Sequence, residues 1–360
     1  MRLGIIGTRG VPNAYGGFEQ FAEFLSKGIV DEHTEVYVYN SHNHPYQEST
    51  WEGVHIIHQY DPEVKMGTFG QFIYDLNCIR DSRKRDFDVL LFLGYTSSSI
   101  WFWLYPGKPK LFTNMDGLEW KRTKYSKPVK AFLQFAEFLG AKFGGHLISD
   151  SKGIKSYLQE QYGLDSTFIP YGAEVFDDPN EAVLQEYELA PYNYNMLIAR
   201  LEPENSIEPI LEAISQSNSG KKMLVVGGTN NAFGALMREK YESDDILFTG
   251  GIYNTNHLNN LRYFSNIYFH GHTVGGTNPS LLEAMGSQAF IIANDNPFNK
   301  AILEDEALYF SDAEDLTEIL NKDLLKSDYM HWVKKNFRKV QEQYNWPLII
   351  SHYKKVLMTK

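Results

Sequence analysis

Short runs of apolar residues recur along the whole chain, and stretches with the spacing of amphipathic helices separate them. In the first half the runs lie at 3–6, 36–39, 89–93, 111–113, 147–149 and 167–169. In the second half they lie at 196–199, 223–226, 246–249, 267–269, 290–293 and 308–310. Runs that are apolar throughout predict strands buried on both faces, and the helices between them predict parallel crossovers. The two successive series predict two doubly wound, Rossmann-like α/β domains.

The predicted boundary between the domains lies near Pro170-Tyr171-Gly172, just before a polar stretch at 177–181. This divides the chain into a first domain over 1–172 and a second over 173–344. Doubly wound sheets bind ligands beyond the carboxyl ends of their strands. With two such domains facing each other, the functional residues are expected in loops after strands, lining a cleft.

Composition and charge narrow the class of protein. Of the 360 residues, 43% are hydrophobic and 22% charged, which is typical of a soluble globular protein. A single cysteine, Cys78, fits a reducing cytoplasm, and the apolar run at the N-terminus is too short for a signal peptide. Residues 1–172 carry 18 Lys+Arg and 19 Asp+Glu, whereas the rest carry 16 and 26, so a nucleic-acid partner is not expected. The basic clusters at 83–85 and 121–130 are interpreted either as solvated ends of helices or as a surface for anionic lipid or a phosphate-bearing acceptor.

The loop that begins at Gly7 contains two adjacent glycines, Gly16 and Gly17. The glycine spacing at its start resembles a dinucleotide fingerprint, but Pro12 falls in the first turns of the expected helix and no acid follows the second strand to hold a ribose. We interpret the loop instead as a long connection in which the glycine pair opens a helix over 18–26. Adjacent glycines let backbone amides approach an anion at the positive end of that helix, which predicts contact with phosphate or sugar. A flexible turn is the alternative.

Charged residues follow three other predicted strands. Asp116, after the strand at 111–113, either binds an acceptor hydroxyl and accepts its proton or caps the next helix. Arg200 follows the first strand of the second domain, where its planar guanidinium suits a diphosphate; a surface salt bridge is the alternative. His270 and His272 suggest a metal pair, but no third ligand has matching spacing, so no metal is expected.

The turn formed by Gly275, Gly276, Thr277 and Asn278 comes next, and a predicted helix over 280–286 follows it. Its backbone amides, together with the side chains of Thr277 and Asn278, are placed to meet phosphate oxygens at the positive end of the helix dipole. Glu283 lies about one turn into the helix, where its carboxylate can accept hydrogen bonds from a ribose diol.

These segments resemble the retaining glycosyltransferases of family 4, and more narrowly the bacterial branch whose N-terminal domain occurs in rhamnosyltransferases of polysaccharide assembly. The matching motifs are GTRG at 7–10, YGGFE at 15–19, DGLEWKR at 116–122, IPYG at 169–172, GGTNPSLLEAM at 275–285 and YNW at 344–346. The resemblance covers almost the whole chain. It implies the GT-B fold, in which two Rossmann-like domains face a cleft and a C-terminal helix, here over 345–360, crosses back to the first domain.

The resemblance also implies roles for the candidate residues. The second domain would bind the nucleotide sugar and the first a saccharide or lipid-linked saccharide acceptor. Gly16 and Gly17 would contact donor phosphate or sugar, Arg200 the diphosphate and Glu283 the ribose. No cofactor or metal is implied, because protein groups neutralise the leaving diphosphate. Retention is assigned to a front-face displacement in which that phosphate deprotonates the incoming hydroxyl.

Two positions depart from the broad family pattern. The family has a glutamate where this chain has Gly275 and a lysine where it has Asn205. Both changes remove groups that stabilise charge or hold the donor sugar. We interpret them as a different donor pocket, consistent with a 6-deoxy sugar such as rhamnose. The expected activity is therefore transfer of a hexosyl group, with a sugar-nucleotide epimerase and a non-catalytic nucleotide-sugar binder as alternatives.

Two aromatic stretches leave membrane association open. The run at 100–105 is rich in aromatic residues, and Phe132, Phe135 and Phe138 share helical spacing after the basic cluster. Such stripes are typical of a core-facing helix. If they are exposed, they would instead dock the first domain on the inner leaflet, near a lipid-linked acceptor.

Overall fold

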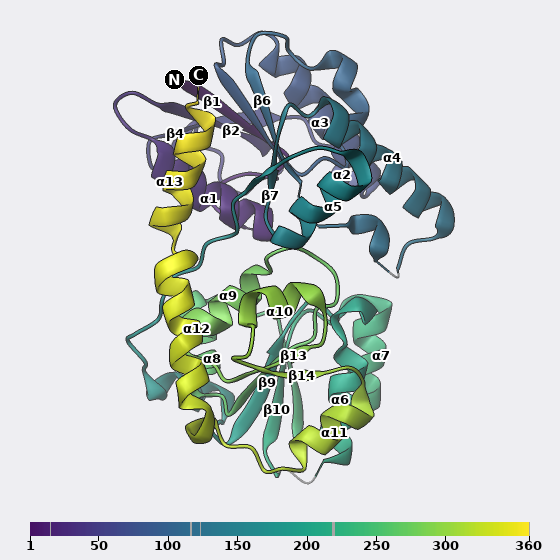
Figure 1. Cartoon of the computed structure of the whole chain (residues 1–360), viewed down its shortest axis with the longest axis vertical. Helices are drawn as coiled ribbons and strands as arrows, with labels where there is room; N and C mark the ends of the chain where they lie inside the picture. Colours follow the sequence, from purple (N-terminus) through teal and green to yellow (C-terminus); the bar gives the residue numbers. More distant parts are fainter. Residues whose placement is uncertain (15, 116, 123, 218–219, 360) are drawn as a thin grey trace. The chain divides into compact units, whose positions relative to one another are not determined.

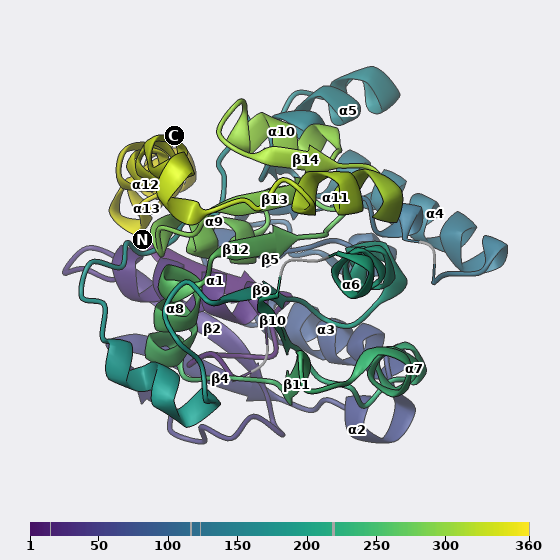
Figure 2. The ribbon, with the colours of Figure 1, turned by 90° about the horizontal axis from the view of Figure 1, so that it is seen from below.

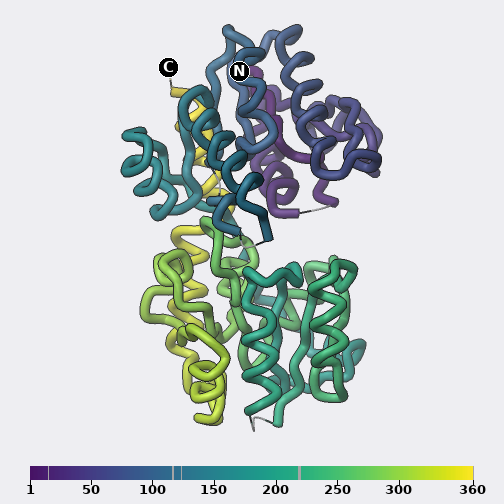
Figure 3. Tube along the Cα trace, turned by 90° about the vertical axis from the view of Figure 1, so that its right-hand side faces the viewer, coloured from purple at the N-terminus to yellow at the C-terminus, as the bar shows by residue number. Residues whose placement is uncertain are grey.

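The computed structural model describes residues 1–14, 16–115, 117–122, 124–217 and 220–359. Residue contacts divide the chain into two compact units. Unit 1 comprises Met1–Trp120, Tyr125–Tyr171 and Trp346–Lys360, and unit 2 comprises Lys121–Lys124 and Gly172–Asn345. Both chain termini lie in unit 1 (Figures 1 and 3).

The sheet of unit 1 has the strand order β3-β4-β2-β1-β5-β6-β7-β8. All neighbours are parallel except the short pair β3 and β4. The strands are β1 (Arg2–Ile6), β2 (Glu35–Ser41), β3 (Thr50–Trp51), β4 (Val54–Gln59), β5 (Val89–Leu93), β6 (Lys110–Met115), β7 (His146–Ser149) and β8 (Thr167–Phe168). The order reverses between β1 and β5, so loops after these two strands diverge to opposite faces and leave a crevice for ligands.

Helices cover both faces of this sheet. They are α1 (Gly17–Ile29), α2 (Glu63–Met66), α3 (Phe69–Ser82), α4 (Lys127–Phe143), α5 (Lys152–Tyr162) and α13 (Trp346–Leu357), with 3-10 helices η1 (Ser99–Leu104) and η2 (Glu119–Lys121). The C-terminal helix α13 packs on α1, where Phe24 stacks on Trp346 with ring centroids 4.4 Å apart. A Cβ on Gly28 would lie 2.3 Å from Cδ1 of the Ile350 side chain, so glycine at this position allows the two helices to approach closely without displacing that side chain.

The sheet of unit 2 has the order β11-β10-β9-β12-β13-β14, and all its strands are parallel. The strands are β9 (Tyr194–Ile198), β10 (Lys222–Val226), β11 (Ile246–Gly250), β12 (Ile267–His270), β13 (Ile291–Asn294) and β14 (Leu308–Phe310). Here the order reverses between β9 and β12. The sequence-predicted strands of both sheets are confirmed within a residue or two at their ends, and only β3 and β4 were missed.

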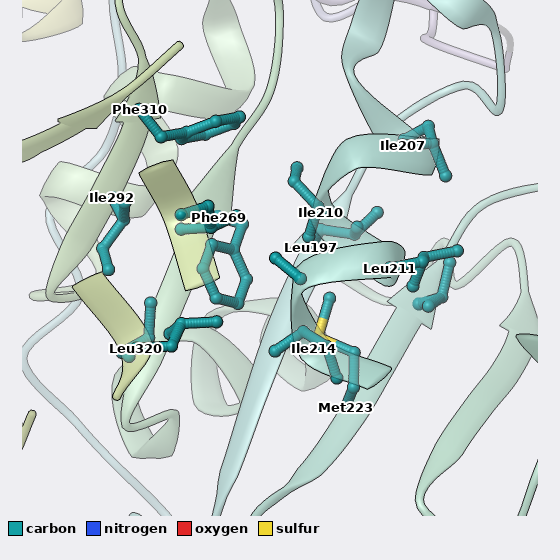
Figure 4. Close-up of a cluster of buried hydrophobic side chains, with 14 of the residues drawn as sticks. Leu197, Ile207, Ile210, Leu211, Ile214, Met223, Phe269, Ile292, Phe310 and Leu320 are labelled. Carbon is teal, nitrogen blue, oxygen red and sulfur yellow. The ribbon is translucent and has the colours of Figure 1, made fainter. Parts of the chain in front are cut away.

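The helices of unit 2 also form two layers, with α6, α7 and α11 on one side of the sheet and α8, α9 and α12 on the other (Figure 2). They are α6 (Ile207–Gln216), α7 (Ala232–Tyr241), α8 (Thr255–Phe264), α9 (Pro279–Gly286), α10 (Pro297–Leu303), α11 (Ala313–Leu320) and α12 (Met330–Gln343), with 3-10 helices η3 (Glu181–Tyr187), η4 (Pro203–Asn205) and η5 (Lys326–Tyr329). Leu197, Phe269 and Ile292 of the central strands meet Ile210 and Ile214 of α6 in a hydrophobic core (Figure 4). Among the described residues, no helix is both long and apolar enough to span a bilayer.

Candidate functional site

Arg200 and the segment after β12 lie at the carboxyl ends of the two strands between which the order of the unit 2 sheet reverses. This is where open α/β sheets bind their ligands. Arg200 is exposed, and its guanidinium makes no hydrogen bond or ion pair with another described residue. A guanidinium without a counter-charge among the described residues, at the carboxyl end of such a strand, is suited to binding an anion.

The helix predicted after the glycine turn is present as α9, which begins at Pro279. Asn278 is its N-cap: its Oδ1 accepts hydrogen bonds from Ser280 N at 2.9 Å and from Ser280 Oγ at 3.0 Å. The cap therefore occupies the Asn278 oxygen and leaves its amide nitrogen as the group that can donate to a phosphate. Thr277 is 4% exposed, so its side chain helps to fix the turn that also contains Gly276.

Gly275 adopts φ +142°, a conformation that side chains other than glycine rarely adopt. A Cβ at this position would meet no atom within 4 Å, so open space lies beside it. The backbone here is thus specific to glycine because of its conformation and not because of crowding.

Glu283 projects from α9 and forms an ion pair with Arg262 of α8, in which Arg262 Nη2 donates to Glu283 Oε2 at 2.5 Å. The Arg262 side chain is 1% exposed and that of Glu283 26% exposed. Arg262 Nη1 donates to Asn259 at 3.2 Å, and its Nε has no hydrogen-bond partner among the described residues. No local sequence pattern indicates Arg262, whose charge orients the predicted ribose-binding carboxylate.

His270 and His272 stack, with ring centroids 4.5 Å apart. Burial lowers the pKa of His270 well below its usual range. Burial, followed by the positive charges of Arg200 and Arg122, lowers the pKa of His272 to about 3. Both imidazoles are therefore neutral at physiological pH, and the charge of Arg200 acts on His272. Among the described residues, no three His, Cys, Asp or Glu side chains gather in a way that would hold a metal ion.

Arg122 belongs to unit 2 by its contacts, although the chain on either side of 121–124 belongs to unit 1. It forms an ion pair with Glu204 at 3.3 Å, with the two side chains 16% and 2% exposed. Lys124 lies 3.8 Å from Glu202. The interpretation of this basic cluster as simply solvated is therefore wrong for Arg122, whose charge also acts on His272. Its partner is 82 residues away, so no local sequence signal could identify the pair.

Asn205 is 6% exposed, and its Nδ2 donates to the backbone carbonyl of Arg200 at 2.7 Å. Its own carbonyl would lie 2.1 Å from a Cβ on Gly271. Asn205 thus fixes the turn that carries Arg200 and holds it close to the loop after β12.

In unit 1, the glycine pair opens a helix as predicted: Gly16 is the N-cap of α1 and Gly17 its first residue. The preceding loop is anchored by Glu19, 3% exposed, which accepts a hydrogen bond from Arg9 N at 2.9 Å. The Arg9 guanidinium donates to both carboxylate oxygens of Glu63, at 2.8 and 2.6 Å. This fixed loop follows β1, at the point where the strand order of unit 1 reverses.

Asp116, the predicted catalytic residue, lies outside the described residues. The segment around it is attached to α4 through Glu137, which is 1% exposed and accepts hydrogen bonds from Trp120 Nε1 at 3.1 Å and from the hydroxyls of Tyr157 and Tyr162 at 2.6 and 2.7 Å. Both interpretations of Asp116, contact with an acceptor hydroxyl and capping of the next helix, stay open.

A cavity of about 640 Å³ opens elsewhere in unit 2, beside the edge strand β11. Tyr187, Thr249, Ile252, Tyr253 and His257 are among its lining residues. None of the candidate residues after β9 and β12 lines it, because β10 and β9 separate β11 from β12.

Two doubly wound α/β sheets, with a C-terminal helix that belongs to the first unit, constitute the GT-B fold, and the predicted fold class is confirmed. Residues 2–174 match a family described as a domain of unknown function (DUF1972). No curated protein sequence matches the chain at a significant level.

Solved structures share the fold over nearly the full length. Sucrose-phosphate synthase from Thermosynechococcus elongatus is 16% identical, with a TM-score of 0.79 over 99% of this chain and 98% of that one. HepE from Anabaena, in complex with UDP-glucose, is 12% identical, with a TM-score of 0.75 over 99% and 98%. WaaG, a glycosyltransferase involved in lipopolysaccharide biosynthesis, is 13% identical, with a TM-score of 0.73 over the whole of both chains. At these identities the likeness concerns the fold.

Proposed function

We propose that the chain is a glycosyltransferase that uses a nucleotide-sugar donor. The observation that carries this proposal is that Arg200 and the turn before α9 follow β9 and β12, the two strands between which the order of the unit 2 sheet reverses, with Glu283 one turn into α9. Proteins of the same fold whose structures contain a nucleotide sugar, such as Anabaena HepE with UDP-glucose, support it.

In this proposal unit 2 binds the donor. Arg200 and Arg122 neutralise the diphosphate, and Gly275, Gly276 and the Asn278 amide donate to its oxygens at the positive end of α9. Glu283, oriented by Arg262, accepts hydrogen bonds from the ribose diol. Arg122 supplies the charge that the family lysine would have supplied at Asn205, a position that here holds the Arg200 turn instead.

The proposed reaction transfers a hexosyl group, with rhamnosyl as our specific candidate, to a saccharide or lipid-linked saccharide bound by unit 1. The bond between the anomeric carbon and the diphosphate oxygen breaks, and the acceptor oxygen bonds to the same face of that carbon. The acceptor proton passes to the departing phosphate, so configuration is retained without an enzymatic nucleophile. Two guanidinium groups can neutralise the leaving group, which supports a mechanism without metal. Asp116, with Gly16 and Gly17, would position the acceptor and the donor sugar.

The test incubates the full chain with a panel of nucleotide sugars, with and without saccharide acceptors, and follows nucleoside diphosphate and sugar products by mass spectrometry. We expect release of nucleoside diphosphate that depends on both substrates, and its loss in Arg200→Ala. The matched control is Arg238→Ala, which removes an exposed arginine from α7 in the same unit. Interconversion of the nucleotide sugars without acceptor would favour an epimerase, and binding without turnover would favour a non-catalytic binder.

A further inference from the structure

Unit 1 exposes aromatic side chains of a kind that folding usually buries. In α4, Phe132, Phe135 and Phe138 are 38%, 55% and 40% exposed, and Phe143 at the end of the helix is 37% exposed. Trp103 of η1 is 60% exposed. We call these five side chains the aromatic face. The interpretation of the two aromatic stretches as core is therefore wrong for Trp103, Phe132, Phe135 and Phe138.

The aromatic face is continuous across neighbouring elements. Phe102 of η1 stacks on Phe143 at 4.1 Å and contacts Trp103 at 5.4 Å. At the other end of α4, Phe132 meets Phe72 of α3 at 5.7 Å, and Phe69, 61% exposed, lies 5.9 Å from Phe72. A contiguous exposed apolar patch of this kind marks an interaction surface, whereas singly scattered residues do not.

The exposed charges of α4 have one sign. Lys127, Lys130 and Lys142 of α4 form no ion pair with a described residue, and the only acid of the helix, Glu137, is 1% exposed. The Nζ of Lys142 lies 5.5 Å from the ring centroid of Phe138 and 5.6 Å from that of Phe143. Lys142 therefore places a positive charge beside two of the exposed rings, and no described acid forms an ion pair with it.

We propose that the aromatic face docks unit 1 on a lipid bilayer that contains anionic phospholipid. Aromatic rings favour the level of the headgroups, and lysines beside them are attracted to anionic lipid. A second copy of the chain is a poorer partner, because a two-fold interface on this face would set its lysines against the same lysines. The inference concerns bilayer binding and stands or fails independently of glycosyl transfer; if both hold, the lipid-linked acceptor is met at this surface.

The experiment is flotation of the full chain with two kinds of vesicle: equal parts phosphatidylethanolamine and phosphatidylglycerol, or phosphatidylcholine alone. We expect binding to the anionic vesicles only, weakened by salt. Phe132→Ser/Phe135→Ser should lower partitioning by at least about tenfold. Replacing Lys127, Lys130 and Lys142 by Gln should lower it by about fivefold per lysine and remove the preference for anionic lipid.

Matched controls change the same residue types on other surfaces. Leu236→Ser/Met358→Ser removes exposed apolar side chains from α7 and the C-terminal end. Gln substitutions at Lys322, Lys334 and Lys355 remove three exposed lysines. Both controls should float like the unsubstituted chain, and all variants should keep its melting temperature and nucleotide binding. The proposal is overturned if the folded chain does not bind anionic vesicles, or if the control variants lose as much binding as the test variants. It is equally overturned if light scattering shows a dimer that Phe132→Ser/Phe135→Ser dissociates.

Discussion

Glu283→Gln should destabilise unit 2, because it leaves the buried Arg262 guanidinium without its counter-charge. Arg262 is the largest fully buried side chain among the described residues. Charges about 4 Å apart interact by about 4 kcal/mol at an effective dielectric of about 20. Glu283 is 26% exposed, which reduces this value, and glutamine keeps a hydrogen-bond acceptor. We therefore expect a loss of about 2 kcal/mol in the free energy of unfolding.

The partner variant and the double variant separate charge pairing from other effects. Arg262→Met leaves Glu283 at a position that water can reach, so its cost should be about 1–2 kcal/mol. In Arg262→Met/Glu283→Gln no charge is left buried, and the coupling between the two sites should be about 2 kcal/mol. Urea unfolding of the full chain measures these values. The unfolding transition that moves to higher urea when a nucleotide is bound is assigned to unit 2.

Nucleotide binding by the same variants tests the second role of Glu283. If its carboxylate also holds the ribose, the double variant should regain stability but bind nucleoside diphosphate about tenfold or more weakly, the cost of losing hydrogen bonds to a charged group. A loss of less than about 0.5 kcal/mol in Glu283→Gln would refute the reasoning about the buried pair. Unchanged nucleotide affinity in the double variant would remove Glu283 from the donor site while leaving the ion pair intact.

Three further predictions address other parts of the chain. Burial raises the pKa of the Asp75 carboxyl from 3.8 to about 7 in the folded chain. Between these two pH values the folded chain therefore binds more protons than the unfolded chain, and the free energy of unfolding falls as the pH rises. Asp75→Asn should remove up to about 1.4 kcal/mol per pH unit of that slope in urea unfolding, and an unchanged slope would contradict the assignment. Gly275→Ala should cost about 1 kcal/mol through its φ of +142°, whereas Gly228→Ala, which has equal space and no such conformation, should cost less; equal losses by calorimetry would contradict this. Arg122→Ala should weaken nucleoside diphosphate binding by calorimetry more than Lys222→Ala does, and the reverse order would exclude Arg122 from the site.

The strands were predictable because most are buried on both faces and therefore read as unbroken apolar runs, such as 89–93 in β5. In the missed strand β4 (Val54–Gln59), near the edge of its sheet, His55 and His58 interrupt the apolar run, and β3 is only two residues long. In a single sequence, neither pattern can be distinguished from that of a loop. The helix start at Pro279 was predictable because proline and an asparagine cap together specify it.

The candidate site was predictable only where its residues directly follow strands, as Arg200 does. Arg262 and Arg122 act through partners 21 and 82 residues away, and such pairings depend on the tertiary fold. The exposure of Phe135 could not be read from the sequence either. A three-residue spacing places rings on one side of a helix but does not say whether another element covers them.

The neutral imidazoles of His270 and His272 lead to one more prediction, which concerns the pH dependence of donor binding. Unit 2 is acidic overall, so a diphosphate must be held by local positive charge, from Arg200, Arg122 and the amides of the α9 turn. His270 and His272 cannot add to it, because burial keeps the pKa of both far below neutrality, that of His272 at about 3. Guanidinium groups do not titrate in this range, and neither do the two phosphates of a nucleotide sugar. The affinity of the chain for a nucleotide sugar, measured by calorimetry, should therefore be constant between about pH 5 and about pH 8. An affinity that rises below about pH 6 in the unsubstituted chain but not in His272→Asn would show that the imidazole ionises and contacts the donor, contrary to the role assigned here.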